Sequence, residues 1–268
     1  MLGKLLRYEI RATGRFFLPC FAGVLGLSIL SRVFWGFQMH NTSSQFLNIF
    51  TAVFTLLLVL MTVASVIIAT LGIIYRFYKN LLSNEGYLMH TLPVRTWEHV
   101  TAKLLSAMLW NILSIVVGAL CVLILGSLAE NFWIDLRMAW AQLWLSLVAA
   151  YQEIGLHLPV LMLMLALLFL LMGAASILLY YTAMSFGQRS DRHKVLVSIG
   201  VYFLILFCLQ TLLILLTVSA IPHIELPVFS GVAAAYLVLG SALALTLALD
   251  AGLFALTTWN LKRHLNLQ

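Results

Sequence analysis

Charged side chains are scarce in this sequence, and Asp250 is the one acid that lies well inside a long apolar run. Only 9% of the 268 residues are charged, whereas a soluble globular domain carries about 25%. Asp250 lies about eight residues, or ~12 Å of helix, before the end of the run Val228 to Thr258. An acid in such a place is a candidate for lining a polar pathway. The competing interpretation is structural, a packing hydrogen bond with Thr246 or with a neighbouring helix.

Catalysis would need more than one acid. An enzyme that works among apolar segments requires two facing carboxylates, a serine with a histidine, or a metal triad. No second carboxylate lies in any of the long apolar runs, and the seven histidines show neither HExxH nor a similar metal-binding spacing. The phosphate-binding pattern GxxxxGK[ST] is missing from the sequence as well. We therefore expect no catalytic residue, no metal site and no cofactor in this chain.

The elements that position these residues are those of a membrane protein. Hydrophobic residues make up 63% of the chain, and crossing ~30 Å of hydrocarbon takes about 20 apolar residues in a helix. Lipid offers the backbone no hydrogen-bond partners, so these spans must be helical. The expected fold is all-α, a single transmembrane domain over residues 1–268 with six spans. The runs are 16–37, 46–75, 104–129, 158–187, 195–221 and 228–258.

Basic residues between the runs indicate the orientation. Before, between and after the six runs, the numbers of Lys and Arg are 4, 0, 4, 1, 3, 0 and 2. Loops rich in Lys and Arg stay in the cytoplasm. Both termini are therefore expected on the cytoplasmic side of the membrane.

Two segments are expected to lie on the membrane. Within residues 1–15, Lys4, Arg7, Arg11 and Arg15 recur at helical spacing beside a leucine-rich face, which predicts an amphipathic elbow helix. Gly14 and Pro19 mark its bend into the first span. Within 130–156, three tryptophans recur with leucines at helical spacing, which predicts an interfacial helix on the outer side. A seventh span is the alternative there.

The link 76–99, RFYKNLLSNEGYLMHTLPVRTWEH, interrupts the apolar pattern on the predicted cytoplasmic side. We expect the helix of the second span to continue into it and to break at Gly86. A short apolar turn over residues 87–89 would follow, and Pro93 would end it. Apolar groups displayed to water favour a protein partner. A loop that rests these groups on lipid headgroups is the plainer alternative.

Residues 76–94, together with the basic elbow, the six-span layout and the ending NLKRHLNLQ, resemble the membrane subunits of bacterial ABC transporters of the ABC-2 export type. In that family a coupling helix between the second and third spans docks into a groove on a separate ATPase. The resemblance thus implies an ATPase interface in this link. Its residues would be Glu85, Gly86, Tyr87, Leu88, Met89, Thr91, Leu92 and Pro93.

The resemblance implies a permease for ATP-driven export of an amphipathic substrate. Its expected partners are an ABC ATPase dimer carrying ATP and Mg, a second permease copy or a related permease, and the lipid bilayer; no nucleic acid is expected. A membrane anchor or sensor that transports nothing remains an alternative. An ion-coupled carrier is another, for which Asp250 is the one candidate group.

Overall fold

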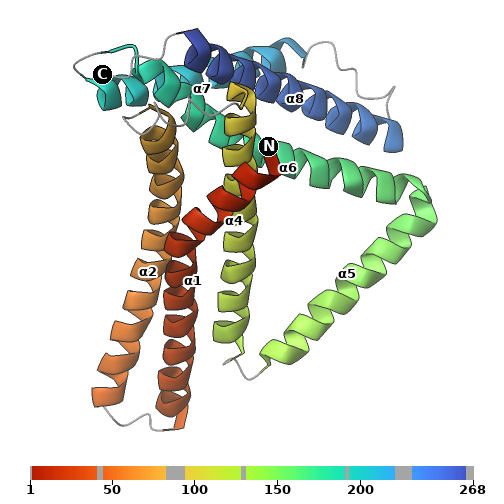
Figure 1. Cartoon of the computed structure of the whole chain (residues 1–268). Helices are drawn as coiled ribbons and strands as arrows, with labels where there is room; N and C mark the ends of the chain where they lie inside the picture. The colour runs from red at the N-terminus through yellow and green to blue at the C-terminus, as the bar shows by residue number, and fades with distance from the viewer. Residues whose placement is uncertain are drawn as a thin grey trace. The chain divides into compact units, whose positions relative to one another are not determined.

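The computed structural model describes residues 2–40, 45–82, 94–127, 131–190, 193–220 and 231–263. Apart from short turns, the chain in these ranges is helical, as the sequence predicts, with seven α-helices and one short π-helical turn (Figure 1). The elements are α1 (Leu2–His40), α2 (Gln45–Phe77), η1 (Tyr78–Leu82), α4 (Thr96–Gly126), α5 (Phe132–Ile154), α6 (His157–Gly187), α7 (Lys194–Ala220) and α8 (Val232–Arg263).

Six of these helices, α1, α2, α4, α6, α7 and α8, are long and apolar enough to cross a membrane. This number confirms the predicted count of spans. Large apolar side chains cover their surfaces, and Leu163, Phe207 and Val238 are each at least 66% exposed. In water such a surface would drive association, whereas hydrocarbon solvates it. The chain is therefore a multi-pass membrane protein.

Helix α5, Phe132–Ile154, forms within the predicted segment 130–156 but is not one of the six. It carries Asp135, Arg137 and Glu153, and no residue along it is buried. At 23 residues it is long enough to cross a membrane, but its composition is too polar to count as a seventh span. Gly155 follows it with φ +57°, a left-handed backbone that glycine adopts without strain, and α6 begins two residues later.

Helix α1 differs from the expected elbow helix followed by a separate span. The backbone stays helical from Leu2 to His40 with Pro19 inside, and its first turns are inclined to the rest (Figure 1). Proline removes one backbone hydrogen bond, and its ring pushes against the carbonyl four residues earlier. In a long helix flanked by good helix formers, this produces a bend more readily than an end.

The described helices form two compact units, where the sequence predicted a single domain. One unit comprises residues 3–73 and 105–148, and the other comprises 1–2, 74–104 and 149–268. We call them the α1–α4 unit and the α6–α8 unit, after the helices that carry their cores. In the α6–α8 unit, α6 packs against both α7 and α8.

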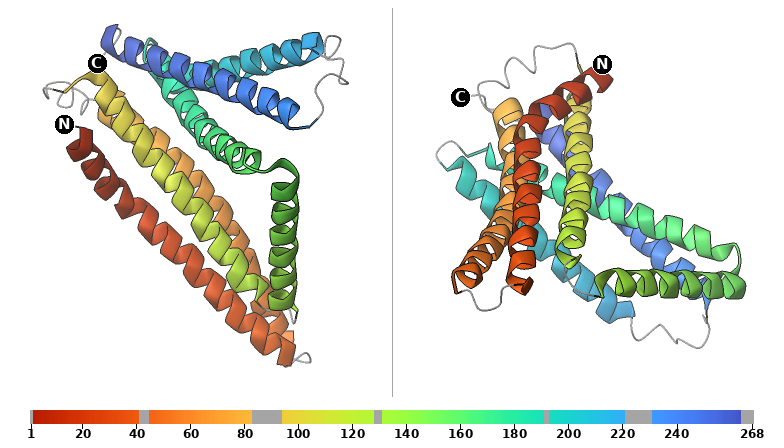
Figure 2. Two further views of the ribbon diagram at one scale, coloured as in Figure 1. Left: turned by 90° about the vertical axis from the view of Figure 1, so that its right-hand side faces the viewer. Right: turned by 90° about the horizontal axis from the view of Figure 1, so that it is seen from below.

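An aromatic cluster forms the core of the α1–α4 unit, in which α1, α2 and α4 run side by side (Figure 2). The rings of Phe17 and Trp110 stack with their centroids 4.8 Å apart, and Phe21 packs beside both. The indole nitrogen of Trp110 donates a hydrogen bond of 2.7 Å to the hydroxyl of Thr13. Stacked rings and a paired indole N–H fix α1 against α4 at this level.

Candidate functional site

The link 76–99 is the candidate site, and the structure describes both of its flanks. Its expected partner-binding residues, Glu85, Gly86, Tyr87, Leu88, Met89, Thr91, Leu92 and Pro93, lie outside the described residues. On the N-terminal flank the chain stays helical through Leu82, as predicted for a helix that continues out of the second span. On the C-terminal flank α4 already begins at Thr96.

The N-terminal flank is anchored by apolar side chains. Phe77 ends α2 and is 1% exposed, and Leu81 and Leu82 in η1 are also buried. The ring of Phe77 stacks on that of Tyr181 in α6, with centroids 4.0 Å apart and planes 9° from parallel. Parallel rings at this separation form a firm contact beyond simple area burial. The end of α2 is therefore held against the C-terminal part of α6.

The C-terminal flank is buried just as deeply. Val100 and Ala102 in the first turns of α4 are at most 1% exposed, and the polar side chains of His99 and Lys103 are buried as well. The backbone N–H of Glu98 donates to the carbonyl of Arg95 at 2.9 Å, which closes the first turn of the helix. Both ends of the link thus leave from packed helices.

A polar seam joins α6 to α8 near their C-terminal ends. The hydroxyls of Thr182 and Thr257, both fully buried, are 2.9 Å apart, and the Thr182 hydroxyl is also 3.2 Å from the carbonyl oxygen of Leu253. Each hydroxyl also lies within hydrogen-bonding distance of a carbonyl in its own helix. A hydroxyl is a donor and an acceptor at once, so the pair links the two helices without leaving a lone donor.

Arg189 closes this seam at the end of α6. Its Nε and one terminal nitrogen donate to the side-chain carbonyl of Asn260 in α8, at 3.2 and 3.0 Å. The guanidinium also lies over the rings of Phe186 and Trp259, 4.9 and 5.7 Å from their centroids. A cation over an aromatic face at such distances is attracted to it. One exposed arginine therefore ties α6 to α8 in two ways.

Several buried polar atoms in the α6–α8 unit have no hydrogen-bond partner among the described residues. They are both side-chain atoms of Gln188, the amide nitrogen of Asn260 and both carboxylate oxygens of Asp250. Gln188 is 3% exposed and Asp250 is 9% exposed. Buried polar groups in folded proteins nearly always have a hydrogen-bond partner. For each of these atoms, a water, a ligand, a partner chain or another arrangement of the helices would supply that partner.

Asp250 is buried in α8, within the helix the sequence predicted. The suggested packing bond from Thr246 is not formed, because the Thr246 hydroxyl bonds to carbonyls of Ala242 and Leu243 in its own helix. A hydroxyl one turn away always has a carbonyl of its own helix within reach as a competing acceptor. The interpretation of Asp250 as a pathway residue stays open.

The contacts between α6 and α8 and the stack of Phe77 on Tyr181 were not predicted from the sequence. Thr182, Ser185 and Gln188 recur every three residues on α6, as do Thr257 and Asn260 on α8. Polar residues at that spacing share one helix face, which marks a face turned away from lipid. This signal was available. The stacking of Phe77 on Tyr181 was not, because the two residues lie 104 positions apart (181 − 77) in uniformly apolar segments.

The described residues include no cluster of His, Cys, Asp or Glu side chains suited to a metal ion. The described parts of the site are two buried flanks of the link and a hydrogen-bonded seam between α6 and α8. Comparison of the chain with protein-family models, with curated proteins and with solved structures finds no match.

Proposed function

We propose that this protein is the membrane subunit of an ABC-2 type exporter, driven by a separate ATPase that docks on the link 76–99. Two lines of reasoning support the proposal. The sequence of the link and of the chain's end resembles that family, and the flanks of the link are built to transmit a displacement. The observation that carries it is the anchoring of both flanks, above all the stack of Phe77 on Tyr181 at 4.0 Å.

A segment that couples an ATPase to membrane helices must be polar enough to leave the bilayer and apolar enough to bind the ATPase. The link combines Glu85 with Tyr87, Leu88 and Met89, which suits a groove with a charged rim. When two ATPase subunits close on ATP, the docked link would move with them. Because Phe77 on the N-terminal flank is stacked against Tyr181, the motion would pass to the C-terminal part of α6 and, through the Thr182–Thr257 contact, to α8.

The finer arrangement follows from the same proposal. Both termini and the link face the cytoplasm of a bacterial cell, the first turns of α1 form the family's elbow on the inner leaflet, and α5 lies on the outer interface. ATP and Mg bind to the partner ATPase dimer, and a second permease completes the pathway. Lipid-facing helices suit an amphipathic cargo that enters from the membrane.

Coexpression with Walker-type ATPases of the same genome tests the proposal. The native chain should copurify with one of them, and the double variant Tyr87→Asp and Leu88→Asp should lose it. A matched control, Tyr151→Asp and Leu156→Asp, adds the same charges at exposed positions and should keep it. The variant Phe77→Ala separates docking from transmission: it should hold the ATPase but lose stimulation of ATP hydrolysis by cargo. A chain that binds no ATPase contradicts the proposal.

An ion-coupled carrier is the second candidate, favoured by the buried, unpaired carboxylate of Asp250. Uptake of labelled amphipathic compounds into inside-out vesicles distinguishes the two. Uptake that needs ATP and survives a proton ionophore supports the exporter. Uptake that needs no ATP, collapses with the ionophore and is abolished by Asp250→Asn supports the carrier. A complex that hydrolyses ATP and moves no compound supports an anchor or sensor.

A further inference from the structure

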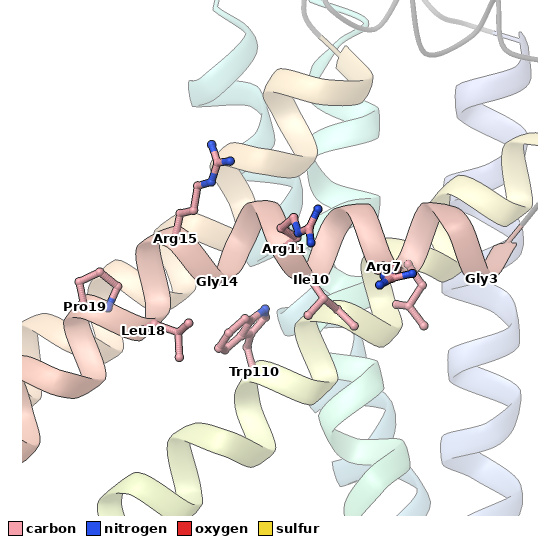
Figure 3. A pocket seen from close by; sticks show the side chains of 10 residues that line it. Gly3, Arg7, Ile10, Arg11, Gly14, Arg15, Leu18, Pro19 and Trp110 are labelled. Atoms are coloured by element: carbon pink, nitrogen blue, oxygen red, sulfur yellow. The ribbon is translucent and has the colours of Figure 1, made fainter.

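A groove of about 900 Å³ follows the first turns of α1, with Trp110 of α4 on one side (Figure 3). Every residue that lines it belongs to the α1–α4 unit. Its size falls in the range of small-molecule sites, about 300–1,000 Å³. The groove is therefore large enough for an organic ligand, and its lining indicates which kind.

One edge of the groove is apolar. Leu6, Ile10 and Leu18 line it at four- and eight-residue spacing, and Gly14 occupies the remaining position of that row. A Cβ atom at Gly14 would meet the Trp110 ring at 3.4 Å, so the missing side chain lets the indole lie close to the helix. Trp110 is itself buried and fixed by Thr13 and Phe17. This edge is a rigid apolar wall.

The other edge is basic. Arg7, Arg11 and Arg15 line the groove at successive four-residue intervals and are exposed. In Figure 3, Trp110, Ile10 and Leu18 lie along the lower side of the helix, whereas the guanidinium groups of Arg11 and Arg15 rise from its upper side. An apolar edge and a basic edge thus run beside each other along one groove.

The three arginines are not neutralised within the described part of the chain, where none of them has an ion-pair or hydrogen-bond partner. The first 40 residues contain one acid, Glu9. It is buried, and it lies two residues from both Arg7 and Arg11, which is about 200° around the helix. Like charges four residues apart repel each other, so a bound anion would relieve that repulsion.

We propose that this groove binds one anionic phospholipid. Arginine presents a planar fork of N–H donors that matches phosphate oxygens, so Arg7, Arg11 and Arg15 would hold the headgroup phosphate. Ile10, Leu18 and the Trp110 ring would receive the first part of an acyl chain. A free phosphate ion would use the arginines and leave the apolar wall empty. The groove places a basic edge beside an apolar edge, and a phospholipid likewise carries a phosphate next to its acyl chains.

The site follows from the predicted orientation but does not depend on any ATPase partner. Basic segments at the cytoplasmic surface attract anionic lipids, which are concentrated in that leaflet. A lipid in the groove would join the bend of α1 to α4 through Trp110. Its consequence is a stability of the α1–α4 unit that varies with the lipid supplied.

Native mass spectrometry of the full chain in neutral detergent tests the proposal. The native protein should retain one phosphatidylglycerol and should not retain phosphatidylcholine. The triple variant Arg7→Gln, Arg11→Gln, Arg15→Gln should bind phosphatidylglycerol at least about tenfold more weakly. A matched control, Arg32→Gln, Arg137→Gln, Lys262→Gln, removes the same charge away from the groove and should bind like the native chain.

Three results overturn the proposal: equal retention by the triple variant, equal loss in the matched control, or equal binding of phosphatidylcholine. Inorganic phosphate is the remaining probe in this experiment. Full occupancy of the groove by phosphate in place of lipid would mean an anion site without lipid recognition, which also overturns the proposal. If the triple variant does not fold, Arg11→Lys replaces it. That variant keeps the charge and loses the fork, and it should weaken phosphatidylglycerol binding about threefold or more.

Discussion

Two buried clusters fix the helices of this protein, and they differ in how completely their polar atoms are paired. The Trp110 cluster of the α1–α4 unit combines stacked rings with a buried threonine, Thr13, whose hydroxyl receives the indole N–H and donates to the carbonyl of Glu9. The Tyr181 cluster of the α6–α8 unit also combines stacked rings with a buried threonine, Thr182. Around it, however, Gln188 and the amide nitrogen of Asn260 have no described partner.

The difference in pairing indicates that the Trp110 cluster belongs to a rigid scaffold, whereas the Tyr181 cluster belongs to a part that changes conformation. A fully paired polar group rigidifies its surroundings, whereas an unpaired one in a low-dielectric interior destabilises the arrangement that buries it. The unpaired atoms lie at the C-terminal ends of α6 and α8. This is where a docked partner, a water or a second conformation of α6 and α8 would supply the missing bonds.

The largest effect is expected for Trp110→Ala, which removes the stack on Phe17 and the bond to Thr13. The loss should be about 3–5 kcal/mol in unfolding free energy, as for other buried large-to-small changes. Cys121 lies in the same core and is buried. In a Cys20→Ser, Cys208→Ser background, its labelling by a maleimide during denaturation measures the loss. As control, Trp110→Phe keeps a ring and should lose about 1 kcal/mol; equal losses would contradict the packing argument.

A smaller loss is expected for Arg189→Ala. It leaves the buried side-chain carbonyl of Asn260 without its two donors, which should cost about 1–3 kcal/mol. A reporter cysteine at Ala183, which is 2% exposed, in a cysteine-free background measures unfolding of the α6–α8 unit. Arg263 also lies over the Trp259 ring, at 5.8 Å. Arg263→Ala is therefore the matched control, and a loss as large as that of Arg189→Ala would assign the effect to the ring instead.

Gln188→Met should stabilise the α6–α8 unit, against the usual direction of a core substitution. Both polar atoms of Gln188 are buried without a described partner, and methionine fills a similar volume, so about 0.5–2 kcal/mol should be gained. Gln152→Met, at an exposed position of α5, is the control and should change nothing measurable. In the complex with an ATPase, the same variant should slow hydrolysis if the unpaired atoms favour a change of state. A loss of more than about 1 kcal/mol would mean that Gln188 has a partner, and the contrast between the clusters would fail.

The sequence predicts the six spans well because lipid imposes a simple rule on length and polarity. It also predicts where α4 begins, because Thr96 is a helix-capping residue type shortly after Pro93. The burial of His99 and Lys103 within the protein was not predicted, because both side chains are polar. The sequence does not predict which helices pack against each other. The polar residues of α6 indicate one face turned away from lipid, but nothing in the apolar pattern of α2 or α6 selects Tyr181 as the partner of Phe77.

The smallest effect is expected for serine in place of the two buried threonines. Thr13→Ser and Thr182→Ser keep the hydroxyl and remove one methyl group, so each should cost about 0.8 kcal/mol or less. The Cys121 and Ala183→Cys reporters compare the two losses directly. Equal losses would show that the threonines serve both clusters in the same way, which leaves Gln188 and Asn260 as the source of the difference. A Thr182→Ser loss several times larger would mean that its methyl group holds α6 to α8, and unpaired polar atoms would then not explain why the Tyr181 cluster differs from the Trp110 cluster.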